Sequence, residues 1–227
     1  QEFVNAKIAR ADVDSTVDRK KWAQTIKDFE SGQIDILVGT QTITKGYHFP
    51  KVTLVGVIWA DVNLSFPIYN CAEITLQQLI QVAGRAGRQS ENSKVIIQTL
   101  INHQIYNYIN EVDYLKFYDY EIEKRQIVSY PPAARLCEIE LKSDNEQTIE
   151  QESQQIANYL EDIIIKNKLE VTLLGPAVPP VAMVKKVYSR KIYLKSNNAT
   201  ILQKLFKSIN FENFKSSIFF VPNPVSH

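Results

Sequence analysis

The sequence predicts two domains, an α/β domain with a mainly parallel sheet followed by a smaller α+β domain. Three observations support this prediction. Apolar runs of strand length alternate with helical patterns in the first half, and the second half shows the order strand, helix, strand, strand, helix, strand. The rigid sequence Tyr130-Pro131-Pro132 lies between the halves. At 227 residues with 44% hydrophobic content, the chain is long enough for two packed cores.

The first half predicts strands that are covered on both faces. Residues 6–13 are expected to form a short strand, and the following helix is expected to be capped by Ser15 or Thr16 and to end at Gly32. The apolar face of that helix carries Trp22, Ile26 and Phe29. Continuous apolar runs at residues 34–38, 52–59 and 94–100 are further expected strands. A second helix is indicated by the spacing of Leu76, Leu79, Ile80 and Ala83.

The second half has the βαββαβ pattern of a ferredoxin-like domain. The expected elements are a strand at 135–142, a helix at 145–165, strands at 170–174 and 184–195, a helix at 198–209 and a strand at 217–221. Ser143 with Glu146 fits a capping box for the first of these helices. The expected division is residues 1–112 for the first domain, 113–132 for a helical and proline-containing connector, and 133–227 for the second domain.

Tyrosines are frequent before and within the connector. They are expected either to pack in a core or to stack on nucleic-acid bases. These residues are Tyr106, Tyr108, Tyr114, Tyr118 and Tyr120.

Charge is unevenly distributed along the second half, although the net charge of the chain is only +1. Residues 138–170 contain nine acidic residues against three lysines, whereas residues 171–211 contain six lysines and one arginine without an acidic residue. Such a cationic stretch indicates either a surface that follows a phosphate backbone or a solvated strand face. The residues that crowd the expected strand and the loop before it are Lys185, Lys186, Arg190, Lys191 and Lys195.

The stretch from Gln81 to Arg88, Q-V-A-G-R-A-G-R, requires a chemical explanation. Its two arginines each follow a glycine at the end of an expected helix, and they lie off the apolar stripe together with Gln81. Guanidinium groups on such a turn can reach one ligand together, and their planar, permanently charged donors suit phosphate oxygens. A surface salt bridge at a helix end is the alternative.

This stretch resembles the last conserved motif of superfamily 2 helicases. Upstream, residues 39–50, G-T-Q-T-I-T-K-G-Y-H-F-P, resemble the motif that links the nucleotide site to the DNA strand in those enzymes. Together with V-T-L-V-G-V at 52–57 and the surroundings of residues 130–132 and 174–176, these strings are similar to the PriA family of primosomal replication-restart helicases. The resemblance covers nearly the whole chain. It implies a second RecA-like helicase lobe followed by a domain that contacts branched DNA, in an enzyme that unwinds DNA in the 3′-to-5′ direction.

The resemblance also implies residue roles at a nucleotide cleft. Arg85 and Arg88 would act as arginine fingers toward the γ-phosphate of ATP, with Gln81 close by. Gly46 would permit close approach of the protein backbone to the nucleotide. The position of His48 often holds a carboxylate in related helicases. An imidazole can hydrogen-bond a ribose hydroxyl, but it supplies no fixed negative charge.

For DNA, the resemblance implies backbone contacts from Thr40, Gln41 and Lys45. In the second domain it favours DNA over a solvated face for Lys185, Lys186, Arg190 and Lys191. Expected partners are therefore forked or single-stranded DNA, with single-strand-binding protein and primosome proteins as further candidates.

The sequence contains no G-x-x-x-x-G-K-[ST] phosphate loop and no D-E-x-H string. We therefore expect a C-terminal piece of a longer protein, with ATP and Mg²⁺ bound mainly by an absent first lobe and no ATP hydrolysis by this chain alone. The resemblance implies zinc in the full-length relative, but Cys71 and Cys137 have no zinc-ligand spacing, so no metal is expected here. No apolar run approaches the roughly 20 residues of a membrane span, and we expect a cytoplasmic protein without a membrane partner.

Two other functions remain open at this point. One is another superfamily 2 DNA translocase, such as a RecG-like motor, and the other is a stand-alone module that binds DNA or a protein partner. A topology other than βαββαβ after Pro132 would favour the first.

Overall fold

The computed structural model describes residues 4–11, 19–40, 43, 47, 49–66, 68–84 and 93–224. The chain divides into two compact units. The N-terminal unit comprises Gln1–Ser65 and Cys71–Leu115, and the C-terminal unit comprises Phe66–Asn70 and Lys116–His227. The short segment Phe66–Asn70 thus belongs to the C-terminal unit, although N-terminal residues flank it on both sides in the sequence.

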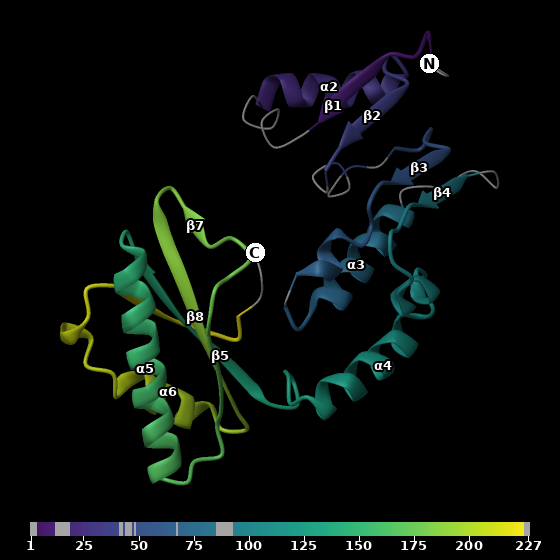
Figure 1. The fold of residues 1–227 in the computed structure, drawn as a ribbon. Coiled ribbons are helices and arrows are strands. Elements are labelled where there is room, and N and C mark those ends of the chain that lie inside the picture. The colour runs from purple at the N-terminus through teal and green to yellow at the C-terminus, as the bar shows by residue number, and fades with distance from the viewer. Residues whose placement is uncertain are drawn as a thin grey trace. The chain divides into compact units, whose positions relative to one another are not determined.

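In the N-terminal unit, short strands alternate with helices, as the sequence predicts (Figure 1). The elements are β1 (Ile8–Ala11), α2 (Arg19–Ser31), β2 (Ile36–Gly39), β3 (Leu54–Val57), a 3₁₀ helix η2 (Val62–Ser65), α3 (Cys71–Ala83), β4 (Lys94–Ile97) and a 3₁₀ helix η3 (Gln104–Tyr108). The two 3₁₀ helices follow β3 and β4 and are four and five residues long.

The described strands of this unit pair in parallel. β1 pairs with β2, so that Ala11 lies opposite Gly39, and β3 pairs with β4, so that Val57 lies opposite Ile97. The predicted parallel pairing is confirmed for these strands. The amphipathic helix α3 is also confirmed, because its buried face is formed by Ala72, Thr75, Leu76 and Leu79.

The C-terminal unit contains an antiparallel sheet with helices on one face (Figure 1). Its elements are α4 (Tyr114–Ile127, which begins in the N-terminal unit), β5 (Arg135–Ser143), α5 (Glu146–Lys166), β6 (Thr172–Ala177), β7 (Met183–Val184), β8 (Val187–Ser196), α6 (Ala199–Lys207), a 3₁₀ helix η4 (Phe211–Asn213) and β9 (Ser217–Pro222). The strand order is β6-β8-β5-β9, and β7 pairs with β8 outside this path.

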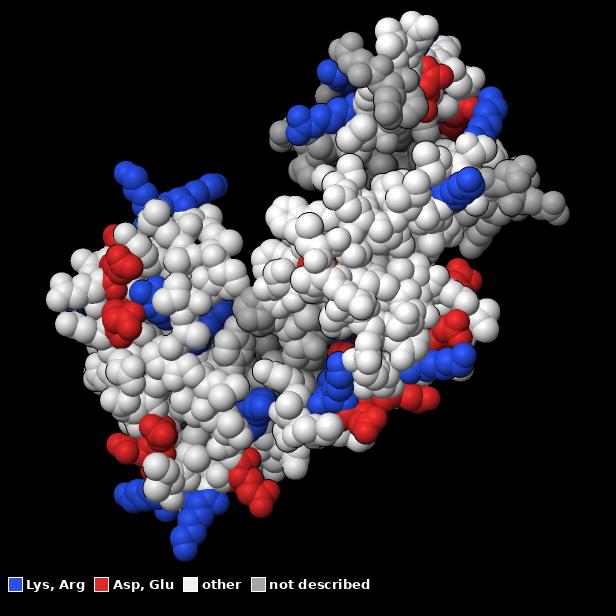
Figure 2. Space-filling model, turned by 45° about the vertical axis from the view of Figure 1, so that its right-hand side comes forward, with Lys and Arg blue, Asp and Glu red and all other residues white. Residues whose placement is uncertain are grey.

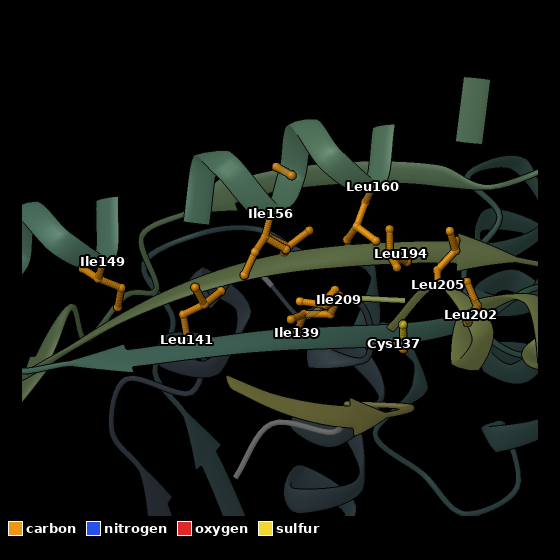
Figure 3. Packing of buried hydrophobic residues seen from close by; sticks show 12 residues of the cluster. Cys137, Ile139, Leu141, Ile149, Ile156, Leu160, Leu194, Leu202, Leu205 and Ile209 are labelled. Carbon is orange, nitrogen blue, oxygen red and sulfur yellow. The ribbon is translucent and has the colours of Figure 1, made fainter. Parts of the chain in front are cut away.

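The core of the C-terminal unit lies between this sheet and its helices (Figure 3). Apolar side chains alternate along β5 and β8, because successive residues of a strand point to opposite faces. Helices α5 and α6 close the inner face with side chains at helical spacing. The buried cluster consists of Cys137, Ile139, Leu141, Ile149, Ile156, Ala157, Leu160, Ile192, Leu194, Leu202, Leu205 and Ile209.

The start of α5 differs from the predicted capping box. The N-cap is Asn145, whose side chain accepts a hydrogen bond of 2.8 Å from the Thr148 amide. Ser143 instead accepts a bond of 3.1 Å from the Asn145 amide. The prediction was wrong because β5 continues through Ser143, which moves the helix start two residues further along the chain.

The single strand predicted at residues 184–195 is also corrected. The structure has a β-hairpin, in which β7 ends at Val184 and β8 begins at Val187. Val184 lies opposite Val187, so that Lys185 and Lys186 form a two-residue turn between them. Two basic residues expected in or beside a strand are therefore at the end of a hairpin.

Aromatic stacking explains why the segment Phe66–Asn70 belongs to the C-terminal unit. The rings of Tyr69 and Tyr130 stack with centroids 5.7 Å apart and planes 17° from parallel. The Arg125 guanidinium lies over Tyr69 at 5.2 Å, and the Lys195 ammonium lies over Tyr130 at 4.6 Å. Each ring of the stacked pair thus also makes a cation–π contact.

Candidate functional site

In the N-terminal unit, the expected DNA contact Thr40 follows the carboxyl end of β2 and is exposed. Gly39, just before it, allows two strands to approach closely. A Cβ atom built on Gly39 would lie 2.3 Å from the Ala11 carbonyl oxygen and 2.9 Å from Ile43 Cγ2. Only glycine fits there, and ligand groups of parallel sheets commonly lie at such strand ends.

The next described residues of this motif are fixed by aromatic contacts with α2. The Phe29 and Phe49 rings meet edge to face at 5.1 Å, and those of Trp22 and Tyr47 do so at 5.9 Å. Trp22 also donates its indole N–H to the Tyr47 hydroxyl. Sequence reasoning did not assign Tyr47 and Phe49 a role, although their spacing of two residues could have indicated that both face the same side. Of the predicted residues here, Gln41, Lys45, Gly46 and His48 lie outside the described residues.

Helix α3 presents Gln81 to solvent. Leu76 and Leu79 on the opposite face are 0% and 3% exposed, and they anchor the helix in the unit. Gln81 is exposed two residues before the end of α3, and the Gly84 amide adds one more hydrogen bond to the Ile80 carbonyl at 2.9 Å. Gln81 is thus held on an ordered helical turn. The predicted arginine fingers, Arg85 and Arg88, lie outside the described part of the chain.

A buried carboxylate, Asp61, joins the loops that follow β3 and β4. Its Oδ2 accepts hydrogen bonds from the Leu100 amide at 2.9 Å and the Ile101 amide at 2.8 Å. Burial raises the pKa of Asp61, but backbone hydrogen bonds lower it by more, so the net pKa is below its ordinary value. Sequence reasoning assigned Asp61 no role. Its position directly after an expected strand was the signal that could have marked it.

The tyrosines in and before the connector differ in their surroundings. The Tyr106 hydroxyl is buried, and burial together with the charge of Asp61 raises the pKa of Tyr106. The Tyr114 hydroxyl accepts a hydrogen bond from Gln77 at 3.1 Å, whereas Tyr118 is 52% exposed. Among these residues, therefore, packing explains Tyr106, and Tyr118 is the more accessible ring.

In the C-terminal unit, Lys185 and Lys186 are exposed at the turn of the β7–β8 hairpin. Figure 2 shows Lys and Arg side chains projecting where this hairpin ends. Within the described part of the chain, neither lysine has a carboxylate at salt-bridge distance. Both ammonium groups are thus available to an anionic ligand.

The other two predicted DNA contacts of this unit have carboxylate partners. Arg190 is 6% exposed on the helix-covered face, with Nε 2.7 Å from Glu150 Oε2 and one terminal nitrogen 3.8 Å from Glu146 Oε1. Lys191 lies on the opposite face, with Nζ 3.0 Å from the Glu138 carboxylate. Alternation along β8 separates these two neighbours, so the structure does not gather the four predicted residues on one face.

Glu138 is buried on the same face of the sheet as Lys191. It is 5% exposed, and Tyr193 and Lys191 are its partners on β8. Burial raises the pKa of Tyr193, and the charge and hydrogen bond of Glu138 raise it further. A charged carboxylate can remain buried here because an ammonium group and a hydroxyl compensate it.

Two further site types are not found in the described residues. No group of three or more His, Cys, Asp or Glu side chains there could hold a metal ion. None of the helices described is both long and apolar enough to cross a bilayer.

Comparison with known proteins covers both units. Residues 1–90 match the helicase conserved C-terminal domain, and residues 126–217 match the C-terminal domain of primosomal protein N. The replication restart protein PriA of Bacillus subtilis is 36% identical over 215 residues, which is 94% of this chain. The chain belongs to the PriA family. The PriA proteins of Synechocystis and Rickettsia conorii are each 35% identical, over 86% and 90% of the chain.

The chain is considerably shorter than these PriA relatives. It spans 26% of the Bacillus protein, 23% of the Synechocystis protein and 31% of the Rickettsia protein. Its two matched domains correspond to the C-terminal part of PriA.

Proposed function

We propose that this chain is the C-terminal part of an ATP-dependent DNA helicase that recognises stalled or branched replication forks, unwinds DNA 3′ to 5′ and restarts replication by primosome assembly. The observation that carries the proposal is the order of the two family matches, a helicase C-terminal domain followed by a PriA C-terminal domain. The chain would supply the second helicase lobe and a DNA-binding domain.

The strand pairing supports a RecA-like lobe and a ferredoxin-like domain. β1–β2 and β3–β4 pair in parallel, as the strands of a RecA-like sheet do. After Pro132, the order β5-α5-β6-β8-α6-β9 is a βαββαβ order, and the sheet order is β6-β8-β5-β9. This order disfavours the RecG-like alternative, for which a different topology was expected after Pro132.

On the nucleotide side, Arg85 and Arg88 would stabilise the charge of the transferring γ-phosphoryl group, with Gln81 beside them. Gly46 and His48 would lie near the ribose and phosphates. Exposure of Gln81 on α3 is compatible with this role. ATP and Mg²⁺ would be bound mainly by a preceding lobe, since a phosphate loop is absent from the sequence.

On the DNA side, Thr40, Gln41 and Lys45 would contact the strand backbone. Lys185 and Lys186 are the strongest candidates in the C-terminal unit, because they are exposed and cationic. Arg190 and Lys191 were predicted to do the same, but their carboxylate partners support a structural role instead. Single-strand-binding protein and primosome proteins are proposed as partners of the full-length protein, in which zinc would be bound outside this chain.

The test uses the 227-residue chain and the full-length protein that contains it. The chain alone should bind forked DNA in a salt-sensitive way and hydrolyse no ATP. In the full-length protein, Arg85→Gln or Arg88→Gln should lower DNA-stimulated ATPase activity by about 10³-fold or more, with DNA affinity retained. DNA-stimulated turnover by the chain alone, or full activity of both arginine variants, would contradict the proposal.

A stand-alone binding module is the second candidate, and the accessible lysine turn favours it. This candidate predicts the same salt-sensitive fork binding by the chain. The two candidates differ in their predictions for the full-length protein, because the second predicts that Arg85→Gln leaves unwinding unchanged.

A further inference from the structure

The turn of the β7–β8 hairpin has an unusual backbone for its sequence. Lys185 and Lys186 have φ angles of 50° and 66°, both in the left-handed region. A two-residue hairpin loop with two positive φ angles is a type I′ turn, for which Asn-Gly is the preferred sequence. Both lysine residues therefore have a left-handed backbone conformation, which residues with a Cβ atom disfavour. Retained strain of this kind is frequently found at functional positions.

Apolar side chains flank this turn. Val184 and Val187 lie directly opposite each other in the hairpin and are 58% and 39% exposed. Residues opposite each other on paired strands point to the same face, so the two valines form one aliphatic pair beside the lysines. Met183, on the other face, is 49% exposed. We call Val184, Lys185, Lys186 and Val187 the hairpin tip.

The charge around the tip favours an anionic partner. Residues 171–211 contain six lysines and one arginine without an acidic residue. Two acidic side chains of β5, on the same sheet face as the valine pair, are already engaged, since Glu140 accepts from Ser189 at 2.9 Å and pairs with Lys142, and Glu138 pairs with Lys191. A polyanion can therefore approach the tip without strong local repulsion.

We propose that the hairpin tip packs its valine pair against the last base pair of a duplex at a fork junction, while Lys185 and Lys186 bind the phosphates on either side. This inference rests on the DNA-binding function proposed above and adds the DNA feature that the site recognises. An aliphatic pair on a stiff turn offers bases no hydrogen bonds, so the contact is independent of sequence.

A junction fits this tip better than continuous duplex does. Apolar side chains can enter DNA where bases unstack, but unstacking an internal step costs free energy. At a fork the terminal pair already has one open face, so this cost is smallest there. The two-residue turn also makes the tip narrow, and it places Val184 opposite Val187 directly beside the lysines.

The test measures binding of the 227-residue chain to forked DNA that carries 2-aminopurine, a fluorescent adenine analogue, at the junction. Placed as the first unpaired base, it is quenched by stacking on the last base pair, so displacement by the valine pair raises its fluorescence. The key variant is Val184→Thr with Val187→Thr, because threonine keeps the branched shape and the strand preference but adds a hydroxyl. Ile165→Thr, at an exposed position of α5, is the matched control.

The wild-type chain and the Ile165→Thr control should raise the junction fluorescence equally. The double threonine variant should lose most of that rise and about fivefold of its preference for forks over linear duplex. Lys185→Gln with Lys186→Gln should weaken binding to both DNAs and reduce the salt slope by about 2. Circular dichroism melting should show that every variant is folded.

The possible failures are distinguishable. A double threonine variant with the wild-type fluorescence rise and fork preference overturns the junction contact, while salt-sensitive binding that depends on the lysines still supports the proposed DNA function. If the wild-type chain binds neither DNA, the proposed DNA function fails and the junction contact fails with it.

Discussion

Arg190 points into the C-terminal unit, with its Nε 2.7 Å from Glu150 Oε2 across the face between sheet and helix α5. A terminal nitrogen also donates to the Ser189 carbonyl at 3.0 Å. Lys185 and Lys186, only a few residues away, are exposed at a hairpin turn. Basic residues that are neighbours in sequence therefore lie in different environments, and variants can separate their contributions to stability and to DNA binding.

Arg190→Gln should lower the free energy of unfolding of the C-terminal unit by about 1–3 kcal/mol, because it removes a charge-assisted hydrogen bond from a buried group. Glu146 and Glu150 are largely exposed, so water can solvate them and the cost stays below that of a fully buried pair. Urea unfolding measures this change. The salt dependence of DNA binding should be unaltered.

The double variant Lys185→Gln with Lys186→Gln is the counterpart of Arg190→Gln, and we expect the opposite pair of results. Stability should change by less than about 0.5 kcal/mol, since both side chains are exposed, while the salt slope of DNA binding falls by about 1 for each lysine. If Arg190→Gln instead reduced the salt slope at unchanged stability, the sequence-based assignment of Arg190 to DNA would be correct.

Much of the C-terminal unit could be predicted because its signals are local and periodic. The inward orientation of Arg190 could also be predicted, since Ile192 and Leu194 follow it at intervals of two residues on the same strand and are core residues. The hairpin turn, however, could not be predicted from the sequence. Lys185-Lys186 lacks the Gly or Asn that marks such turns, and its left-handed backbone depends on pairing between β7 and β8.

Burial of Glu138 could not be predicted either. Its partner Lys191 is 53 residues away in sequence, and only strand pairing brings the two together. In the N-terminal unit, sequence motifs marked Thr40 and Gln81, which the structure places after β2 and near the end of α3. Asp61 and the aromatic contacts of Tyr47 and Phe49 emerge only from packing between distant elements.

The close approach of Gly39 to the Ala11 carbonyl leads to a further prediction. Gly39→Ala should destabilise the N-terminal unit by about 1–3 kcal/mol, because its Cβ would meet backbone that cannot move without separating β1 from β2. Thermal unfolding of the chain measures this loss.

Gly56, in β3, provides the control for that substitution. A Cβ there would have nothing within 4 Å, so Gly56→Ala should be neutral or stabilise the chain by about 0.5 kcal/mol. Equal effects of the two substitutions would show that strand glycines act only through the flexibility of the unfolded chain.

The ion pair of Glu138 and Lys191 predicts strong coupling in a double-mutant cycle. Lys191→Met should cost about 3 kcal/mol, because the buried Glu138 carboxyl group would be left without its ammonium partner. Adding Glu138→Gln should recover part of that loss, since the buried charge is then removed as well. Urea unfolding of the wild type, both single variants and the double variant gives the coupling, and strictly additive losses would argue against a buried ion pair.

The last prediction concerns pH and the carboxylate of Glu152, which accepts hydrogen bonds from the Lys215 amide at 2.8 Å and the Ser216 amide at 2.9 Å. Burial raises the pKa of Glu152, but hydrogen bonds from Ser216 and Lys215 and the charge of Lys215 lower it by more. The folded pKa is therefore below its ordinary value of 4.5. The resulting stabilisation is present above that value and is lost as the pH falls through the folded pKa.

Glu152→Gln tests this dependence because glutamine resembles the protonated acid. At pH 7 the variant should melt at a lower temperature than the wild type, by a few degrees for a loss of about 1 kcal/mol. As the pH falls below 4.5 the difference should shrink, since the wild-type side chain itself becomes neutral. Melting curves between pH 7 and 3 measure it. A gap that stays constant across this range would assign the loss to packing around Glu152 and not to its charge.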